Sequence, residues 1–266
     1  MLAILTVNIG AASLDRAKTL LRWLAARPDD VIILTETSAG PGTAYLLDQF
    51  RQAGYAVVNT CDEIDRGAAL VSRVPVLDPE PFPPTAVTIP GRIAAAVLDT
   101  SPPVIVVGVY VPSRDRSTTK TERKQWFIAS LLDVLAGLTD QQRAHLVLGG
   151  DYNVIARTHQ PLHAGFLPFE FGMLDTLAGL GLIDAHEQCN PGVQAHSWIG
   201  RTGDGYRYDY FHIGRALVRL LDGCVYLHET REQRLTDHAA SAVTLRIQAA
   251  YLDTGDPAEA GEITLF

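Results

Sequence analysis

Single acidic, amide or hydroxyl residues stand at the ends of several apolar segments of this sequence. They are Asn8, Glu36, Tyr110, Asp151 with Asn153, Asp209, and Asp237 with His238. Strand ends at one edge of two packed sheets can converge on a single cleft, which would bring these side chains into one group. Carboxylate and carbonyl oxygens are the hard ligands that Mg²⁺ and Mn²⁺ prefer. The pattern therefore predicts a polar cleft that can hold a divalent cation beside a histidine able to act as a positioned positive charge.

These residues also have ordinary structural explanations. The run 149–153 (Gly-Gly-Asp-Tyr-Asn) can be a plain turn, because Gly, Asp and Asn are common turn formers. Asp237 and His238 can cap the start of a strand, and Glu36 can be an exposed loop residue. Asp209 is the most informative residue, because it lies inside an aromatic strand and a buried carboxylate without a partner is costly.

The elements that must position these residues are mostly strands. Apolar runs predict strands at 2–7, 31–34, 55–60, 67–72, 93–98, 104–110, 145–149, 197–198, 207–213, 224–228 and 239–247. Helical spacing predicts helices after Ser13 and at 43–53, 118–138 and 169–180, and the proline-rich stretch 75–90 reads as irregular chain. Several strands follow one another without a helix between them, so we expect an α/β (α+β) fold: a two-layer β-sandwich flanked by helices.

Composition limits the class of protein. The 266 residues are 47% hydrophobic and 20% charged, which excludes global disorder. The net charge of −8 gives no signal for nucleic-acid binding, although a local basic rim or a bound cation can offset it. The sequence has three cysteines: Cys61, Cys189 and Cys224. Because this number is small and odd, we expect free thiols and a cytoplasmic protein. No stretch is long and apolar enough for a membrane span. We expect one catalytic domain over 1–249 and an acidic tail over 250–266.

The polar segments, taken in order, resemble the motifs of the endonuclease/exonuclease/phosphatase superfamily. The resemblance is to metal-dependent phosphodiesterases of its exonuclease III and apurinic/apyrimidinic (AP) endonuclease branch, and it spans roughly residues 2–247. The matching segments are 6–8, 34–37, 67–73, 109–112, 148–154, 197–198, 205–210 and 236–239, with a branch-specific stretch at 165–184. The resemblance implies the DNase I-like sandwich fold. It also implies that Glu36 is the main ligand of a Mg²⁺ ion, with Asn8 and Asp237 close to the same ion.

The same resemblance implies roles in hydrolysis. Asp151 would activate the attacking water, and Asn153 would position that water or the phosphate. Tyr110 would hydrogen-bond the scissile phosphate. His238 would contact a phosphate oxygen, while Asp209 would accept the other ring N–H of His238 and favour the imidazolium. An aspartate for the water, a positioned cation and a hard metal together suit in-line hydrolysis of a phosphodiester.

Basic and aromatic residues give the substrate expectations. Arg114 and Lys124, with three basic residues between them, could border the cleft and contact phosphates, as could Arg207. The alternative is a solvated helix face with interleaved acidic residues. Trp198 and Tyr206 resemble aromatics that line the substrate pocket of the branch, and they could equally be core residues on strands.

Three departures from the branch bear on the substrate. The metal glutamate lies in Thr-Glu-Thr-Ser, at 35–38, without the lysine usual there, and the segment 7–10 lacks the usual aromatic and second Asn or Asp. Asp209 follows Trp198 by only 11 positions, which shortens a loop that faces DNA in the relatives.

We therefore expect a Mg²⁺-dependent (or Mn²⁺-dependent) DNA phosphodiesterase, acting as a 3′ exonuclease, an AP endonuclease or both, in repair. The first alternative is an enzyme of the same fold acting on RNA, a nucleotide or a lipid phosphate. The second is a non-catalytic binding module, which should have lost some of Glu36, Asp151, Asp209 and His238. DNA is the expected partner, and no membrane or obligate protein partner is implied.

Overall fold

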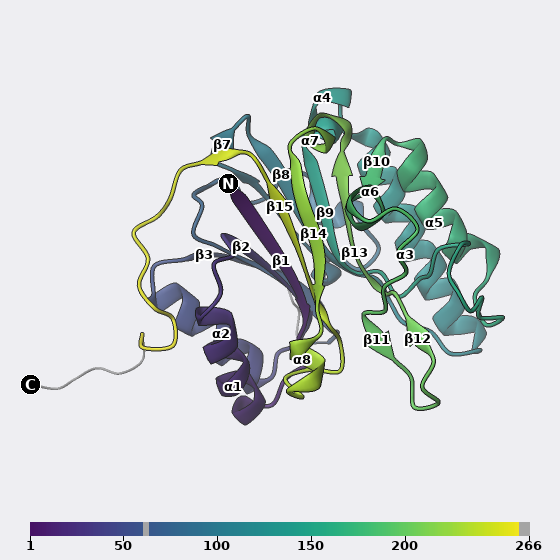
Figure 1. Ribbon diagram of the computed structural model, residues 1–266, viewed down its shortest axis with the longest axis horizontal. Coiled ribbons are helices and arrows are strands. Elements are labelled where there is room, and N and C mark those ends of the chain that lie inside the picture. The colour runs from purple at the N-terminus through teal and green to yellow at the C-terminus, as the bar shows by residue number, and fades with distance from the viewer. Residues whose placement is uncertain (61–63, 261–266) are drawn as a thin grey trace, which may run out of the picture.

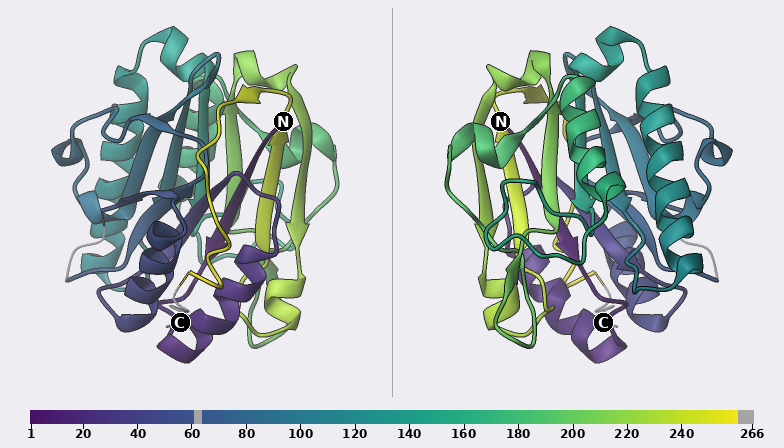
Figure 2. Two further views of the ribbon diagram at one scale, coloured as in Figure 1. Left: turned by 90° about the vertical axis from the view of Figure 1, so that its left-hand side faces the viewer. Right: turned by 90° about the vertical axis from the view of Figure 1, so that its right-hand side faces the viewer.

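The computed structural model describes residues 1–60 and 64–260, and within them two six-stranded sheets face each other (Figures 1 and 2). The first sheet has the order β14 (Leu221–Leu227), β15 (Ala240–Leu245), β1 (Leu2–Asn8), β2 (Val31–Thr37), β4 (Gly67–Ser72) and β3 (Ala56–Asn59). The second has the order β10 (Leu182–Asp184), β13 (Asp209–Gly214), β9 (Leu146–Asp151), β8 (Val104–Tyr110), β6 (Ile93–Leu98) and β5 (Val76–Asp78). In each sheet the parallel pair (β1 with β2, β8 with β9) lies among antiparallel neighbours.

Helices cover the outer face of each sheet, so the molecule has four layers (Figure 1). The longer helices are α1 (Leu14–Ala25) and α2 (Pro41–Gln52) on the first sheet, and α3 (Thr118–Gly137) and α5 (Pro168–Gly179) on the second. Shorter ones are α4 (Asp140–Ala144), α6 (Ala185–Cys189), α7 (Arg215–Val218) and α8 (Glu229–Glu232), with 3₁₀ turns at Pro84–Ala86 and Pro90–Arg92. Two short ribbons pair β11 (Trp198–Ile199) with β12 (Gly205–Tyr206) and β7 (Thr100–Ser101) with β16 (Gln248–Ala249).

The central strands are apolar on both faces because both faces are covered. Ile4 of β1 belongs to the core between the two sheets, whereas Leu5 and Val7 pack against α1 and α2. In the second sheet Val147 faces the first sheet, and Leu148 faces α3 and α5. This double burial explains why these strands read as continuous apolar runs, without the alternation of a half-exposed strand.

Glycines let the sheets approach beside the site. A Cβ at Gly149 would stand 2.4 Å from the Phe211 ring and 2.8 Å from Ile33, across the sandwich. Gly150, at φ +141°, has no room either, because a Cβ there would lie 2.0 Å from the carbonyl oxygen of Val109. The two glycines before Asp151 are therefore required by packing and by backbone conformation.

The sandwich architecture predicted from the sequence is confirmed, and the differences lie in element ends and in short elements that were not predicted. Ser13 caps α1, as predicted, by accepting the N–H of Arg16. The second helix begins at Pro41, two residues earlier than expected, because proline suits the first helical turn. The proline-rich stretch carries one short strand, β5, and two 3₁₀ turns. The strand β10 was not predicted.

The C-terminal stretch is hydrogen-bonded to the domain as far as Gly255. Leu252 and Gly255 donate backbone hydrogen bonds to the carbonyls of Arg73 and Ala53, at 2.8 Å each. In Figure 1 this stretch runs from β7 towards α2. The rest of the predicted tail, 261–266, lies outside the described residues, as does Cys61, and the domain boundary at 249 stays a prediction.

Two further sequence expectations can be compared with the structure. Cys189 and Cys224 are free thiols, as predicted. In the described ranges, no helix combines the length and apolarity that crossing a bilayer requires.

Candidate active site

Strand register brings Asp151, Asp209 and Tyr110 side by side at one edge of the second sheet. Asp151 is the last residue of β9, and it pairs with Asp209 of β13 on one side and with Tyr110 of β8 on the other. All three are at most 3% exposed. Tyr110 and Asp209 are 41 and 58 positions from Asp151 in the sequence, yet strand pairing makes them its neighbours.

The first sheet delivers its residues to the same edge. Asn8 ends β1, and Glu36 lies in a bulge of β2 at φ +53°. A bulge redirects a side chain that regular pairing would aim elsewhere. His238 precedes β15 and forms an isolated bridge with Trp198. The Nδ2 atom of Asn8 donates to Asp151 Oδ2 (2.9 Å) and Glu36 Oε1 (3.2 Å), so the two sheets meet at this amide group.

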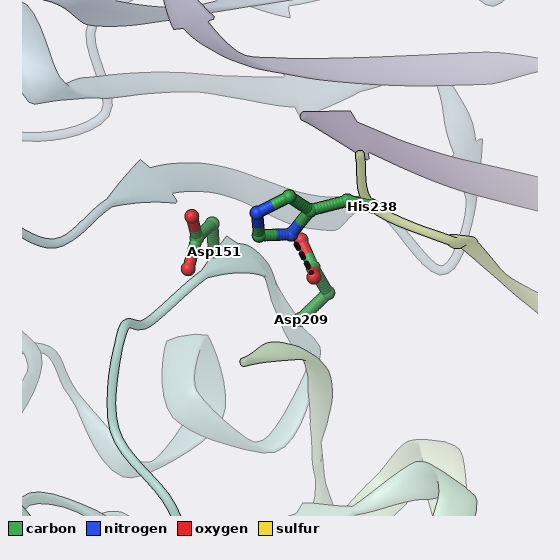
Figure 3. A group of neighbouring side chains, drawn as sticks. All are labelled: Asp151, Asp209 and His238. Carbon is green, nitrogen blue, oxygen red and sulfur yellow. Dashed lines mark hydrogen bonds and ion pairs between the residues drawn. The ribbon is translucent and has the colours of Figure 1, made fainter. Parts of the chain in front are cut away.

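Asp209 and His238 form a buried pair (Figure 3). His238 Nδ1 donates to Asp209 Oδ2 at 2.7 Å, while Nε2 points towards Asp151. Ser197 Oγ accepts the N–H groups of Tyr208 and Asp209, and Thr230 Oγ1 donates to the His238 carbonyl. Both members of the pair are thereby fixed through their backbones.

The pair favours the imidazolium form of His238. Burial lowers the pKa of His238, but the charge and hydrogen bond of Asp209 outweigh burial and raise it to about 9. The second oxygen of Asp209, Oδ1, is buried and has no hydrogen-bond partner among the described residues. The pair can therefore present a positive charge, through Nε2, to an anion in the cleft.

The carboxyl group of Asp151 has a raised pKa. Burial and the nearby Asp209 raise its pKa to about 7, against the opposing effects of His238 and of hydrogen bonds from Asn153 and Asn8. The N–H of Asn153 donates to Oδ1 at 2.9 Å, and Asn153 itself has φ +49°. The side chain of Asn153 donates to the carbonyl of Val111 at 3.0 Å. Asp151 is thus oriented from both sides and poised to accept a proton near neutral pH.

The donors fit a hard divalent cation on the Glu36 side of the cleft. Glu36 and Asp151 offer carboxylate oxygens that converge on the same amide group, and Arg66 already ion-pairs with Glu36. A positive charge is therefore accommodated at this carboxylate, and oxygen donors suit Mg²⁺ or Mn²⁺. Asp237 lines the same cleft, and its Oδ2 accepts the indole N–H of Trp198 at 3.1 Å.

The side-chain amide of Asn8 has a defined orientation. Its Oδ1 accepts the N–H of Gly10 at 2.8 Å, which fixes the amide orientation because only oxygen can accept. The group turned towards Glu36 and Asp151 is consequently the NH₂ donor. In this arrangement Asn8 holds the two carboxylates, and its place beside a metal ion stays a prediction.

A cleft of about 560 Å³ opens beside these groups, lined by Glu36, Asn153, Asp237, His238 and aromatic side chains. The wall contains Trp198 and Tyr206, with ring centroids 5.4 Å apart; their contact with substrate stays a prediction. Tyr208 and His163 extend it: Tyr206 stacks on Tyr208 at 5.2 Å and on His163 at 3.9 Å. Flat aromatic faces of this kind can stack on sugars or bases.

The expected basic contacts to substrate are corrected by the structure. Arg207 does not line this cleft: its guanidinium donates to Asp184 (2.6 Å) and Tyr226 (2.8 Å) in a buried position. Lys124 and Arg114 do line it, but both are bound to Glu170 and mostly buried. Arg207 therefore forms a structural ion pair. Lys124 and Arg114 do not form an exposed basic rim.

Sequence reasoning missed Glu170, His163 and Tyr208. Tyr208 lies between β12 and β13, two positions after Tyr206, and this alternation of tyrosines is a usable signal. His163 lies two positions before the stretch 165–184 that carries the branch resemblance, and this proximity is its only signal in the sequence. Glu170 had no signal, because an acidic residue in the first turn of a helix is normally exposed.

The chain belongs to the endonuclease/exonuclease/phosphatase family. The model of the Endonuclease/Exonuclease/phosphatase family matches residues 5–228. A comparison with curated protein sequences gives no match.

Similar solved structures agree with the predicted branch and confirm the DNase I-like fold. The 3′–5′ exonuclease NExo of Neisseria meningitidis is 25% identical with a TM-score of 0.76. A structure of the 3′ phosphatase NExo from Neisseria bound to a product DNA hairpin gives 24% and 0.75, and an AP endonuclease from Archaeoglobus fulgidus gives 20% and 0.74. Each comparison covers 92% of this chain and 99% of the other. The chain is accordingly a hydrolytic enzyme of the phosphodiesterase and nuclease class, as predicted.

Proposed function

We propose that this protein is a divalent-metal-dependent nuclease that hydrolyses phosphodiester bonds of DNA, at 3′ ends, at abasic sites or at both, in DNA repair. The observation that carries the proposal is the buried Asp209–His238 pair beside Asp151, at the edge where both sheets end. The names of the similar structures support the substrate class, since they are a 3′–5′ exonuclease, a 3′ phosphatase with product DNA and an AP endonuclease.

In the proposed reaction, Asp151 accepts the proton of the attacking water. Its pKa of about 7 suits this role, because a base works best when its pKa is near the working pH. Asn153 supports the orientation of Asp151 through its backbone N–H and offers a side-chain donor beside it. The side-chain N–H groups of Asn8 hold the carboxylates of Asp151 and Glu36 close to each other.

His238 is proposed to stabilise the charge on the phosphate oxygens in the transition state. Its Nδ1 is occupied by Asp209, so Nε2 is the atom that can donate to a phosphate oxygen. Tyr110 is proposed to hydrogen-bond the phosphate from the neighbouring strand. Burial and the charge of Asp151 raise the pKa of its hydroxyl, so it remains a proton donor at neutral pH.

A bound Mg²⁺ or Mn²⁺ would neutralise the phosphate and the leaving oxygen. Glu36 would hold it, with Asp237 as a further oxygen donor across the cleft. The aromatic wall of Trp198 and Tyr206 is proposed to receive the terminal or abasic nucleotide.

The test uses three labelled DNA duplexes: one blunt, one with a recessed 3′ end and one with a single abasic-site analogue. Each is incubated with Mg²⁺ and with EDTA. We expect cleavage only with Mg²⁺, and its position assigns the activity: stepwise loss from the 3′ end or nicking at the abasic site. A wild-type protein that leaves all three duplexes intact while it hydrolyses a simple phosphodiester would contradict the DNA assignment.

A matched pair of variants excludes a contaminating nuclease in that assay. His238→Gln should lose the activity. His145→Gln should keep it, because His145 lies next to the start of β9, at the opposite end of that strand from Asp151. Equal activity in both variants would refute the proposed role of His238.

A further inference from the structure

A lysine in the wall of the cleft is almost completely buried. Lys124 of α3 is 1% exposed, although lysine is almost never fully buried without a partner. Its Nζ atom donates to Glu170 Oε1 and to the carbonyl oxygen of Asn153, at 2.6 Å each. Two of its three N–H donors are therefore committed inside the protein.

Glu170 joins this lysine to two other parts of the cleft. Its second oxygen, Oε2, accepts from Arg114 Nε (3.1 Å) and Nη2 (2.5 Å), and also from the N–H of Leu167 (2.7 Å). Arg114 in turn donates to the carbonyl of Gly165 at 2.6 Å. Gly165 precedes a cleft-lining phenylalanine. One carboxylate thus ties together α3, the chain that follows β8 and the start of α5.

The carbonyl oxygen that Lys124 holds belongs to a residue in a left-handed backbone conformation. Asn153 has φ +49°, which is uncommon outside glycine, although asparagine adopts it more readily than most residues. Such conformations persist only where the surroundings fix them. The N–H of Asn153 is fixed by Asp151 Oδ1 (2.9 Å), and its carbonyl is fixed by Lys124. Hydrogen bonds therefore hold both the N–H and the carbonyl of Asn153, whose side chain is proposed to position the water.

We propose that Lys124, Glu170 and Arg114 are positioning residues: together they hold Asn153, and the segment at Gly165, in the geometry that hydrolysis needs, without touching the substrate. This inference rests on the proposed function, since it concerns the same site. It replaces the sequence-based expectation that Lys124 and Arg114 are phosphate contacts.

The geometry separates these two roles. A phosphate contact must turn its charge towards solvent, yet the Lys124 ammonium faces a carboxylate and a carbonyl in a buried place. Withdrawing it would leave Glu170 with one cation fewer and the Asn153 carbonyl without this donor. Breaking a buried ion pair is strongly unfavourable, so the lysine stays where it is during turnover.

The test compares the steady-state kinetics of Lys124→Met with those of Arg73→Met. Methionine keeps most of the side-chain volume and removes the donor. Arg73 is the matched control, because it too is bound to a buried carboxylate, Asp30 (2.9 Å), and to a backbone carbonyl, that of Pro28. It directly follows Ser72, at the end of β4 away from Glu36.

For Lys124→Met we expect kcat to fall by roughly 10- to 100-fold, as displacing a reacting group by about 1 Å does. KM should change less than about threefold, and the salt dependence of KM should stay that of the wild type. Lys124→Arg should recover part of kcat, because it retains a donor. Arg73→Met should keep kcat within about twofold.

Two results would overturn the inference. A raised KM with a weaker salt dependence and an unchanged kcat would make Lys124 a phosphate contact. A kcat that falls no further in Lys124→Met than in Arg73→Met would make the group merely structural. If Lys124→Met does not fold, Lys124→Arg and Glu170→Gln decide: a kcat loss at constant KM in both supports the inference, and wild-type kcat in both refutes it.

The outcome is distinguishable from a failure of the proposed function. If the wild-type protein does not cleave DNA, the same variants are compared on bis(p-nitrophenyl) phosphate. Activity of the wild-type protein on DNA decides the proposed function. The ratio of variant to wild-type kcat on the simple phosphodiester decides the positioning role.

Discussion

The Asp151→Asn variant should lose activity. Its unfolding free energy should increase relative to that of the wild-type protein as the pH rises. Asp151 is 1% exposed, and burial together with Asp209 raises its pKa from 3.8 to about 7. In the folded state the carboxyl therefore keeps its proton in a range where the unfolded chain has already released it. Between these two values the unfolded state binds fewer protons, so the stability of the wild-type protein falls as the pH rises.

The size of the effect follows from the two pKa values. Each pH unit in this window costs about 1.4 kcal/mol of folding free energy. Between pH 5 and pH 7 the wild-type protein should lose roughly 2 kcal/mol through this one group, allowing for the rounding of the titration at both ends. Asparagine does not titrate, so the variant lacks this slope.

The substitution also has a cost that does not depend on pH. The new amide nitrogen would face Asn8 Nδ2, which now donates to Asp151 Oδ2 at 2.9 Å. A mismatched buried pair of donors costs about 1–3 kcal/mol. The wild-type protein has already lost about 1.6 kcal/mol through the same titration between pH 3.8 and pH 5, so the two proteins should be about equally stable at pH 5. By pH 7 the variant should be the more stable of the two.

The assay is urea unfolding of wild-type protein and Asp151→Asn at pH 5, 6 and 7, with EDTA present to remove divalent cations. Asp133→Asn, at an exposed position of α3, serves as the control for removing an acidic side chain. The reasoning predicts that the difference in unfolding free energy shifts by roughly 2 kcal/mol in favour of the variant. A difference that is flat across the three pH values would refute the raised pKa.

Further predictions concern the same site and the backbone beneath it. The pH profile of kcat/KM should rise through about 7 as Asp151 ionises and fall above about 9 as His238 loses its proton; a flat profile over that range would contradict both assignments. Asp209→Asn should lower kcat by roughly 10²- to 10⁴-fold, and NMR titration should show a lower pKa for His238; an unchanged imidazole pKa would exclude the pairing as its cause. Glu36→Ala should require more Mg²⁺ for half-maximal activity, and a titration curve identical to that of wild type would remove Glu36 as a ligand. Gly150→Ala should lower the unfolding free energy by at least ~3 kcal/mol, because its methyl group would meet a carbonyl at 2.0 Å; a loss below ~1 kcal/mol in urea melts would show that the backbone relaxes.

The sequence was sufficient to predict where the polar residues gather. Apolar strands that end in one polar residue place Asn8 and Asp151 at strand ends, and the observed register brings them within hydrogen-bond distance. The sandwich itself could be predicted because consecutive strands without intervening helices are typical of packed antiparallel sheets. The short strand β10 offers only two apolar residues, which is too little for a pattern.

The partner of each charged residue could not be predicted. Lys124 and Arg114 appear in the sequence as members of a basic cluster, and Glu170 lies 46 and 56 positions further along the chain. Arg207 pairs with Asp184, 23 positions away, for the same reason. Whether a cation faces solvent or a buried carboxylate depends on tertiary packing, and no local pattern carries that information.

The central claim is that Asp151 and the Asp209–His238 pair hydrolyse a DNA phosphodiester. The most direct measurement is single-turnover cleavage of the recessed-end and abasic-site duplexes by wild-type protein and by Asp151→Asn, with Mg²⁺ and with saturating enzyme. We predict a rate at least 10³-fold lower for the variant, with DNA affinity and the folded spectrum retained. A variant that cleaves at more than about a tenth of the wild-type rate would contradict the claim, because the proton of the attacking water would then need another acceptor.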